Sequence, residues 1–182
     1  GTDVLKVVTK HMHAKGKEVL AAIRMNDTHH RIIEHNHPLA PQFAIDHPER
    51  ASALIMACTS ARMEGPTRQV IPSWPETAEK QGMEPFIETA LDRWFIESFR
   101  TANPEIMDLY RKMIGANPPL GYAANARGIM EYDLSDEVHK IQCPTLLVTG
   151  ESDYSTPIKD HEFLVQHIPK SALKIVEQAS HT

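Results

Sequence analysis

Cysteine is scarce in this 182-residue sequence, because Cys58 and Cys143 are the only two and lie far apart. A chain without a disulfide framework suits a reducing compartment, so we expect a cytoplasmic protein. No apolar run approaches the roughly 18 residues that span a bilayer, and the N-terminal segment lacks the apolar centre of a signal peptide. The net charge of −5 argues against the basic face that nucleic acids require. We therefore expect neither a membrane nor a nucleic acid as partner.

Glycine and serine are missing from a long internal stretch. No glycine occurs between Gly16 and Gly65, and no serine occurs before Ser52. A serine nucleophile elbow, Gly-x-Ser-x-Gly, needs glycines because a side chain would clash in its strained turn. The nearest match, Gly150-Glu-Ser-Asp-Tyr154, lacks the second glycine. The sequence therefore contains no serine nucleophile of this type.

Apolar runs and helical periodicity alternate in the second half of the chain. Continuous apolar runs bounded by turn residues predict buried strands, and apolar residues at i, i+3, i+4 and i+7 predict helices. Strands that alternate with helices predict an α/β fold with a parallel sheet. The predicted strands are 51–58, 143–149 and 173–176, the predicted helices are 83–99, 103–113, 121–132 and 157–168, and 61–75 is expected to be irregular.

Two polar residues follow neighbouring predicted strands. Asp153 comes just after one strand and His181 just after the next. Because the carboxyl ends of parallel strands share one edge, the carboxylate can accept the imidazole Nδ1–H, as in a catalytic triad. The order acid, then histidine, is that of the α/β-hydrolases. The alternative is that Asp153 only caps the following helix and that His181 belongs to a frayed tail.

Several segments resemble the 3-oxoadipate enol-lactonase-like branch of the α/β-hydrolase superfamily. They are Asp46-His-Pro-Glu-Arg50, Gly121-Tyr-Ala-Ala124, Tyr132-Asp-Leu-Ser135 and the strand that leads from Ile141 to Asp153. The resemblance covers residues 46–182 and implies the C-terminal half of such a fold, a partial α/β-hydrolase. It also implies a small ester or lactone substrate and no cofactor. The implied roles are triad acid for Asp153, triad base for His181, a helical cap at about 65–130, and ligand contacts by Trp94 and Tyr122 in that cap.

The resemblance places the missing serine shortly before Phe43, so we expect an incomplete triad that is inactive as it stands. A thiolate can replace serine, but Cys58 ends the strand after the expected elbow, and a buried structural cysteine is the better interpretation. The alternative function is a non-catalytic remnant that binds a small molecule. Missing partner strands would expose a sheet edge, which predicts self-association.

Residues 1–45 resemble one helix–strand–loop unit of a glycoside-hydrolase-like TIM barrel, on Asp3-Val-Leu-Lys6, His13-Ala-Lys-Gly16 and the segment Ala22 to His30. This resemblance predicts a unit of different origin, and therefore a chimera joined near residues 43–50. Four loop histidines also permit a zinc or copper site, but nothing sets a tetrahedral geometry, so no metal is predicted. The residues implied to face a sugar are Asn26, Asp27, His29 and His30, and the loop histidines are His29, His30, His35 and His37.

Overall fold

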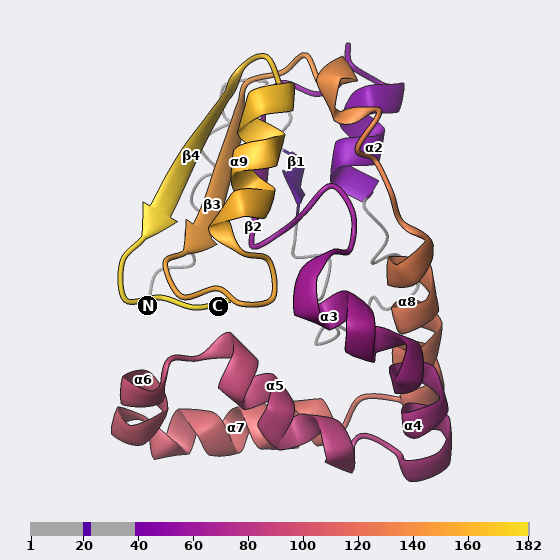
Figure 1. Cartoon of the computed structure of the whole chain (residues 1–182), viewed down its shortest axis with the longest axis vertical. Helices are drawn as coiled ribbons and strands as arrows, with labels where there is room; N and C mark the ends of the chain where they lie inside the picture. Colours follow the sequence, from indigo (N-terminus) through magenta and orange to yellow (C-terminus); the bar gives the residue numbers. More distant parts are fainter. Residues whose placement is uncertain (1–19, 23–38, 182) are drawn as a thin grey trace.

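The computed structural model of the chain describes residues 20–22 and 39–181 (Figure 1). Its strands form one parallel sheet in the order β1-β2-β3-β4. The register pairs Leu54 of β2 with Thr145 of β3, and Thr145 with Ser171 of β4. The predicted α/β class with a parallel sheet is therefore confirmed. The strands are β1 (Leu20–Ala22), β2 (Leu54–Ala57), β3 (Thr145–Gly150) and β4 (Ser171–Val176).

Two helices pack on one face of this sheet. They are α2 (Leu39–Asp46) and α9 (Ile158–His167), and both also contact the short 3-10 helix η4 (Val138–Lys140). Apolar side chains of alternate strand residues fill the space between the helices and the sheet, where burial of each contributes about 1.5–3 kcal/mol. The most deeply buried members of this core are Leu54, Met56, Val138, Ile141, Leu147, Leu164 and Ile168.

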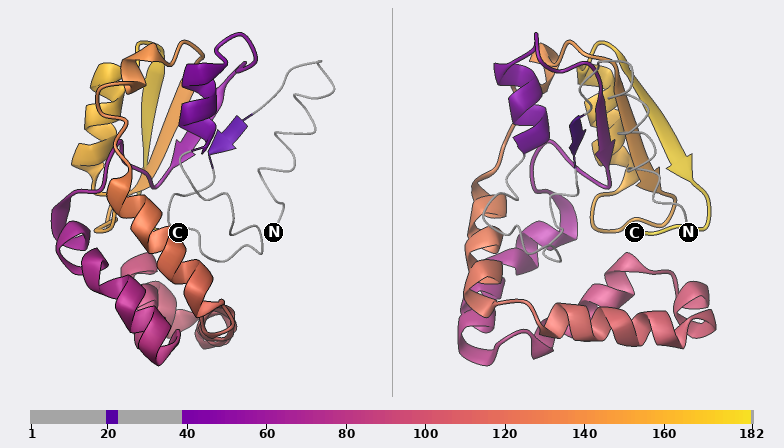
Figure 2. Two further views of the ribbon diagram at one scale, coloured as in Figure 1. Left: turned by 90° about the vertical axis from the view of Figure 1, so that its right-hand side faces the viewer. Right: turned by 180° about the vertical axis from the view of Figure 1, so that it is seen from behind.

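A helical segment, residues 65–131, connects β2 to β3. It lies beyond the carboxyl ends of the strands, toward which the arrowheads of β3 and β4 point in Figure 1, and Figure 2 shows the same arrangement from two further sides. Its apolar core is separate from that of the sheet. The segment consists of α3 (Gly65–Val70), η2 (Ile71–Ser73), α4 (Trp74–Gln81), η3 (Glu84–Phe86), α5 (Ile87–Trp94), α6 (Glu97–Ala102), α7 (Pro104–Gly115) and α8 (Pro119–Glu131).

Two predictions about this segment were wrong. Residues 61–75, expected to be irregular, contain α3 and the start of α4, since a six-residue helix is too short to show an i, i+7 repeat. The helix predicted at 83–99 is divided, because Phe95 adopts an extended conformation (φ −126°, ψ 136°) that ends α5. The break gives α5 and α6 different directions, so one amphipathic pattern serves two helices.

The sheet face that turns away from α9 carries apolar side chains in contact with solvent. Leu146 is 40% exposed and Val176 is 41% exposed. Self-association through such surfaces stays a prediction. In the described part of residues 1–45, β1 joins the sheet beside β2, and the foreign origin of this unit also stays a prediction. Among the described residues, no helix is long and apolar enough to cross a membrane.

Candidate active site

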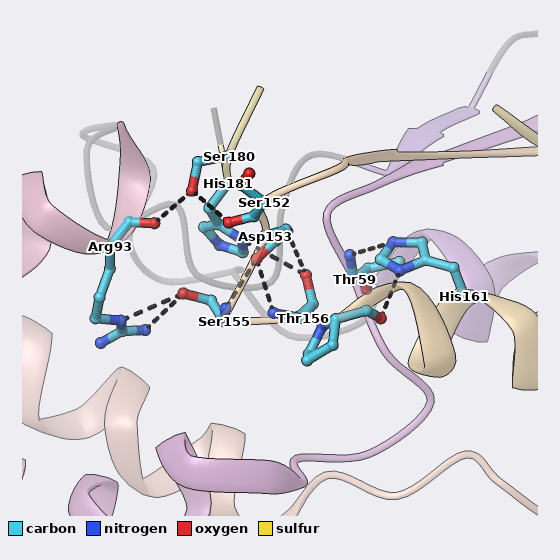
Figure 3. A network of polar contacts seen from close by, with 10 residues as sticks. Thr59, Arg93, Ser152, Asp153, Ser155, Thr156, His161, Ser180 and His181 are labelled. Carbon is cyan, nitrogen blue, oxygen red and sulfur yellow. Dashed lines mark hydrogen bonds and ion pairs between the residues drawn. The ribbon is translucent and has the colours of Figure 1, made fainter. Parts of the chain in front are cut away.

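Asp153 and His181 meet at the carboxyl edge of the sheet (Figure 3). Asp153 lies in the loop after β3 and His181 in the loop after β4, as the parallel register requires. The distance between His181 Nδ1 and Asp153 Oδ2 is 2.8 Å, and both side chains are fully buried. Because a carboxylate only accepts hydrogen bonds, Nδ1 carries the proton in this pair. The arrangement fixes the tautomer of His181.

The Asp153 carboxylate accepts further hydrogen bonds from its own loop. Oδ1 accepts from the backbone N–H of Ser155 (2.8 Å) and of Thr156 (2.9 Å), and Oδ2 accepts from the Thr156 hydroxyl (2.8 Å). Burial acts to raise the pKa of Asp153, but the hydrogen bonds and charge of His181 and the bonds from Thr156 hold that pKa below its ordinary value. Asp153 is therefore ionised at neutral pH. The Thr156 side chain thus binds the carboxylate, and Pro157 is the N-cap of α9.

The acid loop and the histidine loop touch through their backbones. Ser152 N–H donates to Ala179 O at 2.9 Å, and the Ser180 hydroxyl donates to Ser152 O at 3.0 Å. A Cβ atom on Gly150 would lie 2.1 Å from Ser180 O and 2.5 Å from Ala179 O. Only glycine fits at such a close backbone approach. Gly150 is thus needed for the two loops to bring the acid and the histidine together.

A cavity of about 190 Å³ opens in the helical segment between α4, α5 and α8. Trp94 and Tyr122, the two predicted ligand contacts of this segment, both line it. Trp94 is buried, and burial raises the pKa of the Tyr122 hydroxyl, which stays protonated. Most of the wall is apolar, as in many small-molecule sites. Its other lining residues include Trp74, Thr77, Phe86, Arg93, Asn125 and Ile129.

Arg93 connects this cavity to the acid loop. Its Nε and Nη2 both donate to Ser155 Oγ at 3.2 Å, its guanidinium lies 5.0 Å from the centre of the Trp74 ring, and its backbone oxygen accepts from Ser180. Burial lowers the pKa of the guanidinium, while Tyr122 and Asp153 raise it. Among the described residues no carboxylate forms an ion pair with Arg93. The cavity is therefore bordered by a half-buried cation, which sequence reasoning missed because no motif marks it.

A second buried histidine holds the end of β2. His161 on α9 is fully buried, its Nε2 accepts from the backbone N–H of Thr59 at 3.2 Å, and its Nδ1 lies 3.3 Å from Pro157 O. Nδ1 therefore carries the proton, and burial lowers the pKa of this imidazole, so it is neutral at pH 7.

Next to Thr59, Cys58 adopts a left-handed conformation with φ 49°. Its Sγ, a ring nitrogen of His181 and a carboxylate oxygen of Asp153 all lie within 4.8 Å of one another.

The predicted ligand residues of the N-terminal unit, Asn26, Asp27, His29 and His30, lie outside the described residues. The same holds for His35 and His37 of the predicted alternative metal site. Their roles stay predictions. The structure thus brings together Asp153 with His181, and Trp94 with Tyr122, and it adds Arg93, Cys58 and His161 around them.

Known proteins share both the sequence and the architecture of this chain. It is 32% identical, over 138 residues, to 3-oxoadipate enol-lactonase 2 of Acinetobacter baylyi. The crystal structure of the enol-lactonase from Burkholderia xenovorans matches 98% of the chain with a TM-score of 0.79 and 22% identity. The thermophilic esterase from Thermogutta terrifontis matches 97% with a TM-score of 0.75 and 28% identity. This chain belongs to the α/β-hydrolase superfamily. It is enol-lactonase-like and related to ester and lactone hydrolases, and the predicted partial α/β-hydrolase fold is confirmed.

This α/β-hydrolase spans only part of its relatives. The match to the Acinetobacter lactonase covers 76% of the chain but 51% of the relative, so the chain spans about half the length of that protein. The two solved structures are covered to 63% and 62% of their length. No family profile matches the chain. What the complete relatives do is therefore carried over only as a proposal.

Proposed function

We propose that the described residues form the acid–base pair and the substrate pocket of an ester or lactone hydrolase site. The observation that carries this proposal is the fully buried His181–Asp153 pair, with 2.8 Å between Nδ1 and Oδ2, at the carboxyl edge of a parallel sheet. Buried pairs at that edge are where α/β-hydrolases hold their acid and base. The sequence similarity to an enol-lactonase supports the same site chemistry.

In this site His181 is the general base. The hydrogen bond to Asp153 fixes the tautomer with its proton on Nδ1, which leaves Nε2 as the basic atom. The ionised carboxylate also stabilises the imidazolium that forms when His181 takes up a proton. The three additional hydrogen bonds to Asp153 keep it in place as the proton moves. Asp153 thus orients the base and does not itself react.

The cavity in the helical segment would hold the substrate, with this segment acting as its cap. Its apolar wall suits a short carbon chain, and Arg93 at its border suits an anionic group, because among the described residues this half-buried cation has no carboxylate partner. We therefore propose a small ester or lactone that also carries a carboxylate. Arg93 would bind the carboxylate, and the Trp94 and Tyr122 rings would pack against the chain.

The absence of Gly-x-Ser-x-Gly from the sequence limits what the pair can activate. Our proposal includes the consequence that this chain performs no serine-dependent hydrolysis. On serine chemistry alone it would bind its ligand without turnover. The missing motif is the specific observation that favours this second function, ligand binding, over catalysis.

Calorimetric titration with monomethyl succinate, an ester that carries a carboxylate, tests the pocket. Arg93→Met should weaken binding about 10- to 100-fold, because a hydrogen bond to a charged group contributes about 1.5–3 kcal/mol. Arg127→Met is the matched control, since Arg127 lies on α8 and pairs with Glu79 outside the cavity. Equal affinities of the two variants would refute the pocket, and labelling of the chain by a serine-directed fluorophosphonate would refute the absence of serine chemistry.

A further inference from the structure

We propose that Cys58 supplies the nucleophile of this site, in a Cys58–His181–Asp153 arrangement that replaces the serine triad. The proposal rests on the function proposed above, because it needs His181 as base and, for the acyl group, the cavity that Arg93 connects to the acid loop. It is carried by one juxtaposition, in which the Cys58 sulfur, a His181 ring nitrogen and an Asp153 carboxylate oxygen lie within 4.8 Å of one another. A thiol beside a base that a third group orients is the general pattern of an activated nucleophile.

The backbone fixes Cys58 at this place. It follows β2 directly, at the same carboxyl edge as the acid loop after β3, and its N–H donates to Val148 O at 2.8 Å. The next residue, Thr59, is held by the buried imidazole of His161. Between these two anchors Cys58 has φ 49°, a conformation that costs energy for any residue with a side chain and that concentrates at functional sites. The turn therefore holds the thiol beside the acid–base pair.

The same three side chains are also a possible donor set for zinc, and the hydrogen bonds of Asp153 decide against that alternative. Both of its oxygens already accept two hydrogen bonds each, from Ser155, Thr156 and His181. A metal would have to displace one of these groups from a buried carboxylate, at a cost of about 1–3 kcal/mol or more for the donor left unpaired. With both oxygens hydrogen-bonded, Asp153 holds the imidazole of His181 in place. His181 then acts as the base for the Cys58 thiol.

The reaction is balanced with water as its one co-reactant. His181 takes the proton of the Cys58 thiol, the sulfur bonds to the acyl carbon, and the bond from that carbon to the ester oxygen breaks as the leaving oxygen takes the proton from His181. Water then attacks the thioester and gives a proton to His181. The carbon–sulfur bond breaks, and the thiolate is reprotonated by His181. The net change is an ester or lactone plus water to an acid and an alcohol.

Cys143 provides a matched control thiol. It precedes β3, at the opposite edge of the sheet, and burial raises the pKa of its thiol although Thr145 lowers it. Both cysteines are buried, and neither is in a disulfide. Cys143→Ala and Cys58→Ala therefore make the same chemical change in similar burial, and only Cys58 adjoins the pair.

The test is the reaction of the chain with p-nitrophenyl acetate, followed by p-nitrophenol release and by peptide mass mapping after an acid quench. We expect one acetyl group on Cys58, and a loss of release of about 100-fold or more in Cys58→Ala and in His181→Ala, the scale of general-base catalysis. Cys143→Ala should keep the adduct and the rate. Cys58→Ser, nearly isosteric, guards against misfolding, and each variant is checked by its unfolding midpoint.

Three results would overturn the proposal: an acetyl group on another residue, a Cys58→Ala rate equal to that of the unmodified chain, or a rate that chelators abolish and zinc restores. The monomethyl succinate titration distinguishes a failure of the Cys58 nucleophile from a failure of the proposed function. If Arg93→Met weakens binding and Cys58 stays unacylated, the pocket stands and the thiol nucleophile is wrong. If Arg93→Met leaves binding unchanged, the proposed function itself is wrong.

Discussion

Replacing Gly150 with alanine should separate the two loops that carry the candidate acid and base. The added Cβ would lie 2.1 Å from Ser180 O and 2.5 Å from Ala179 O, so two backbone segments would have to move by more than an ångström. The displaced segment is joined directly to His181. A shift of that size would break the 2.8 Å contact between His181 and Asp153.

The expected cost follows from what is broken. Overpacking costs about 1–3 kcal/mol, and breaking a buried charged pair costs about 3–5 kcal/mol. Since the two events are the same movement, we expect the free energy of unfolding to fall by about 3–5 kcal/mol. For a chain of this size that corresponds to a fall in melting temperature of roughly 10 °C. Urea unfolding followed by the fluorescence of Trp74 and Trp94 measures the free energy.

Gly115→Ala is the control. Gly115 is the last residue of α7, and a Cβ there would meet only Ile87 Cδ1 at 3.5 Å, an ordinary contact. The higher helix propensity of alanine should leave this variant as stable as the unmodified chain, or up to about 1 kcal/mol more stable. If Gly150→Ala unfolds at the same urea concentration as Gly115→Ala, the close approach of the two loops is not what positions His181, and our reasoning is wrong.

Two further substitutions test buried polar groups away from the pair. Burial raises the pKa of Asp160 to about 6 from 3.8, so its contribution to stability is present below pH 4 and is lost as the pH rises through 6. Asp160→Asn should therefore stabilise the chain by up to about 3 kcal/mol at pH 8 and hardly at all at pH 4; equal gains at both pH values in thermal unfolding would contradict this. The Tyr132 hydroxyl is buried without a hydrogen-bond partner among the described residues, so Tyr132→Phe should raise the free energy of unfolding by about 1 kcal/mol, and a loss of that size in urea unfolding would show that the hydroxyl is satisfied.

The part of the site that depends on strand order could be predicted from the sequence. Asp153 and His181 each follow an apolar run, and parallel pairing of β3 with β4 brings the ends of those runs together. Local patterns specify such strands, because short apolar runs bounded by turn residues are typical of strands, although one face of β3 and β4 stays partly exposed in the structure. The boundaries were less well predicted, since β2 begins three residues later and β4 two residues earlier than the predicted strands.

The remaining site residues depend on packing between distant segments. Arg93 reaches Ser155, 62 residues away, and His161 meets Thr59, 102 residues away. Cys58 was predicted to end its strand and lies just after the end of β2, but its nearness to His181 depends on the turn that Thr59 and His161 hold. No local pattern encodes these contacts, because each is set by how the helical segment and α9 dock onto the sheet.

The chain order of the sheet has a consequence for folding. β3, α9 and β4 are contiguous within residues 145–176. Pairing of β2 with β3, in contrast, closes a long loop that contains the helical segment of residues 65–131. Because closing a short loop costs less entropy than closing a long one, we expect the β3–α9–β4 unit to form first. The loops that carry Asp153 and His181 follow β3 and β4 of this unit, so we expect the acid–base pair to form early. The helical segment with its cavity would then pack against a pair that is already in place.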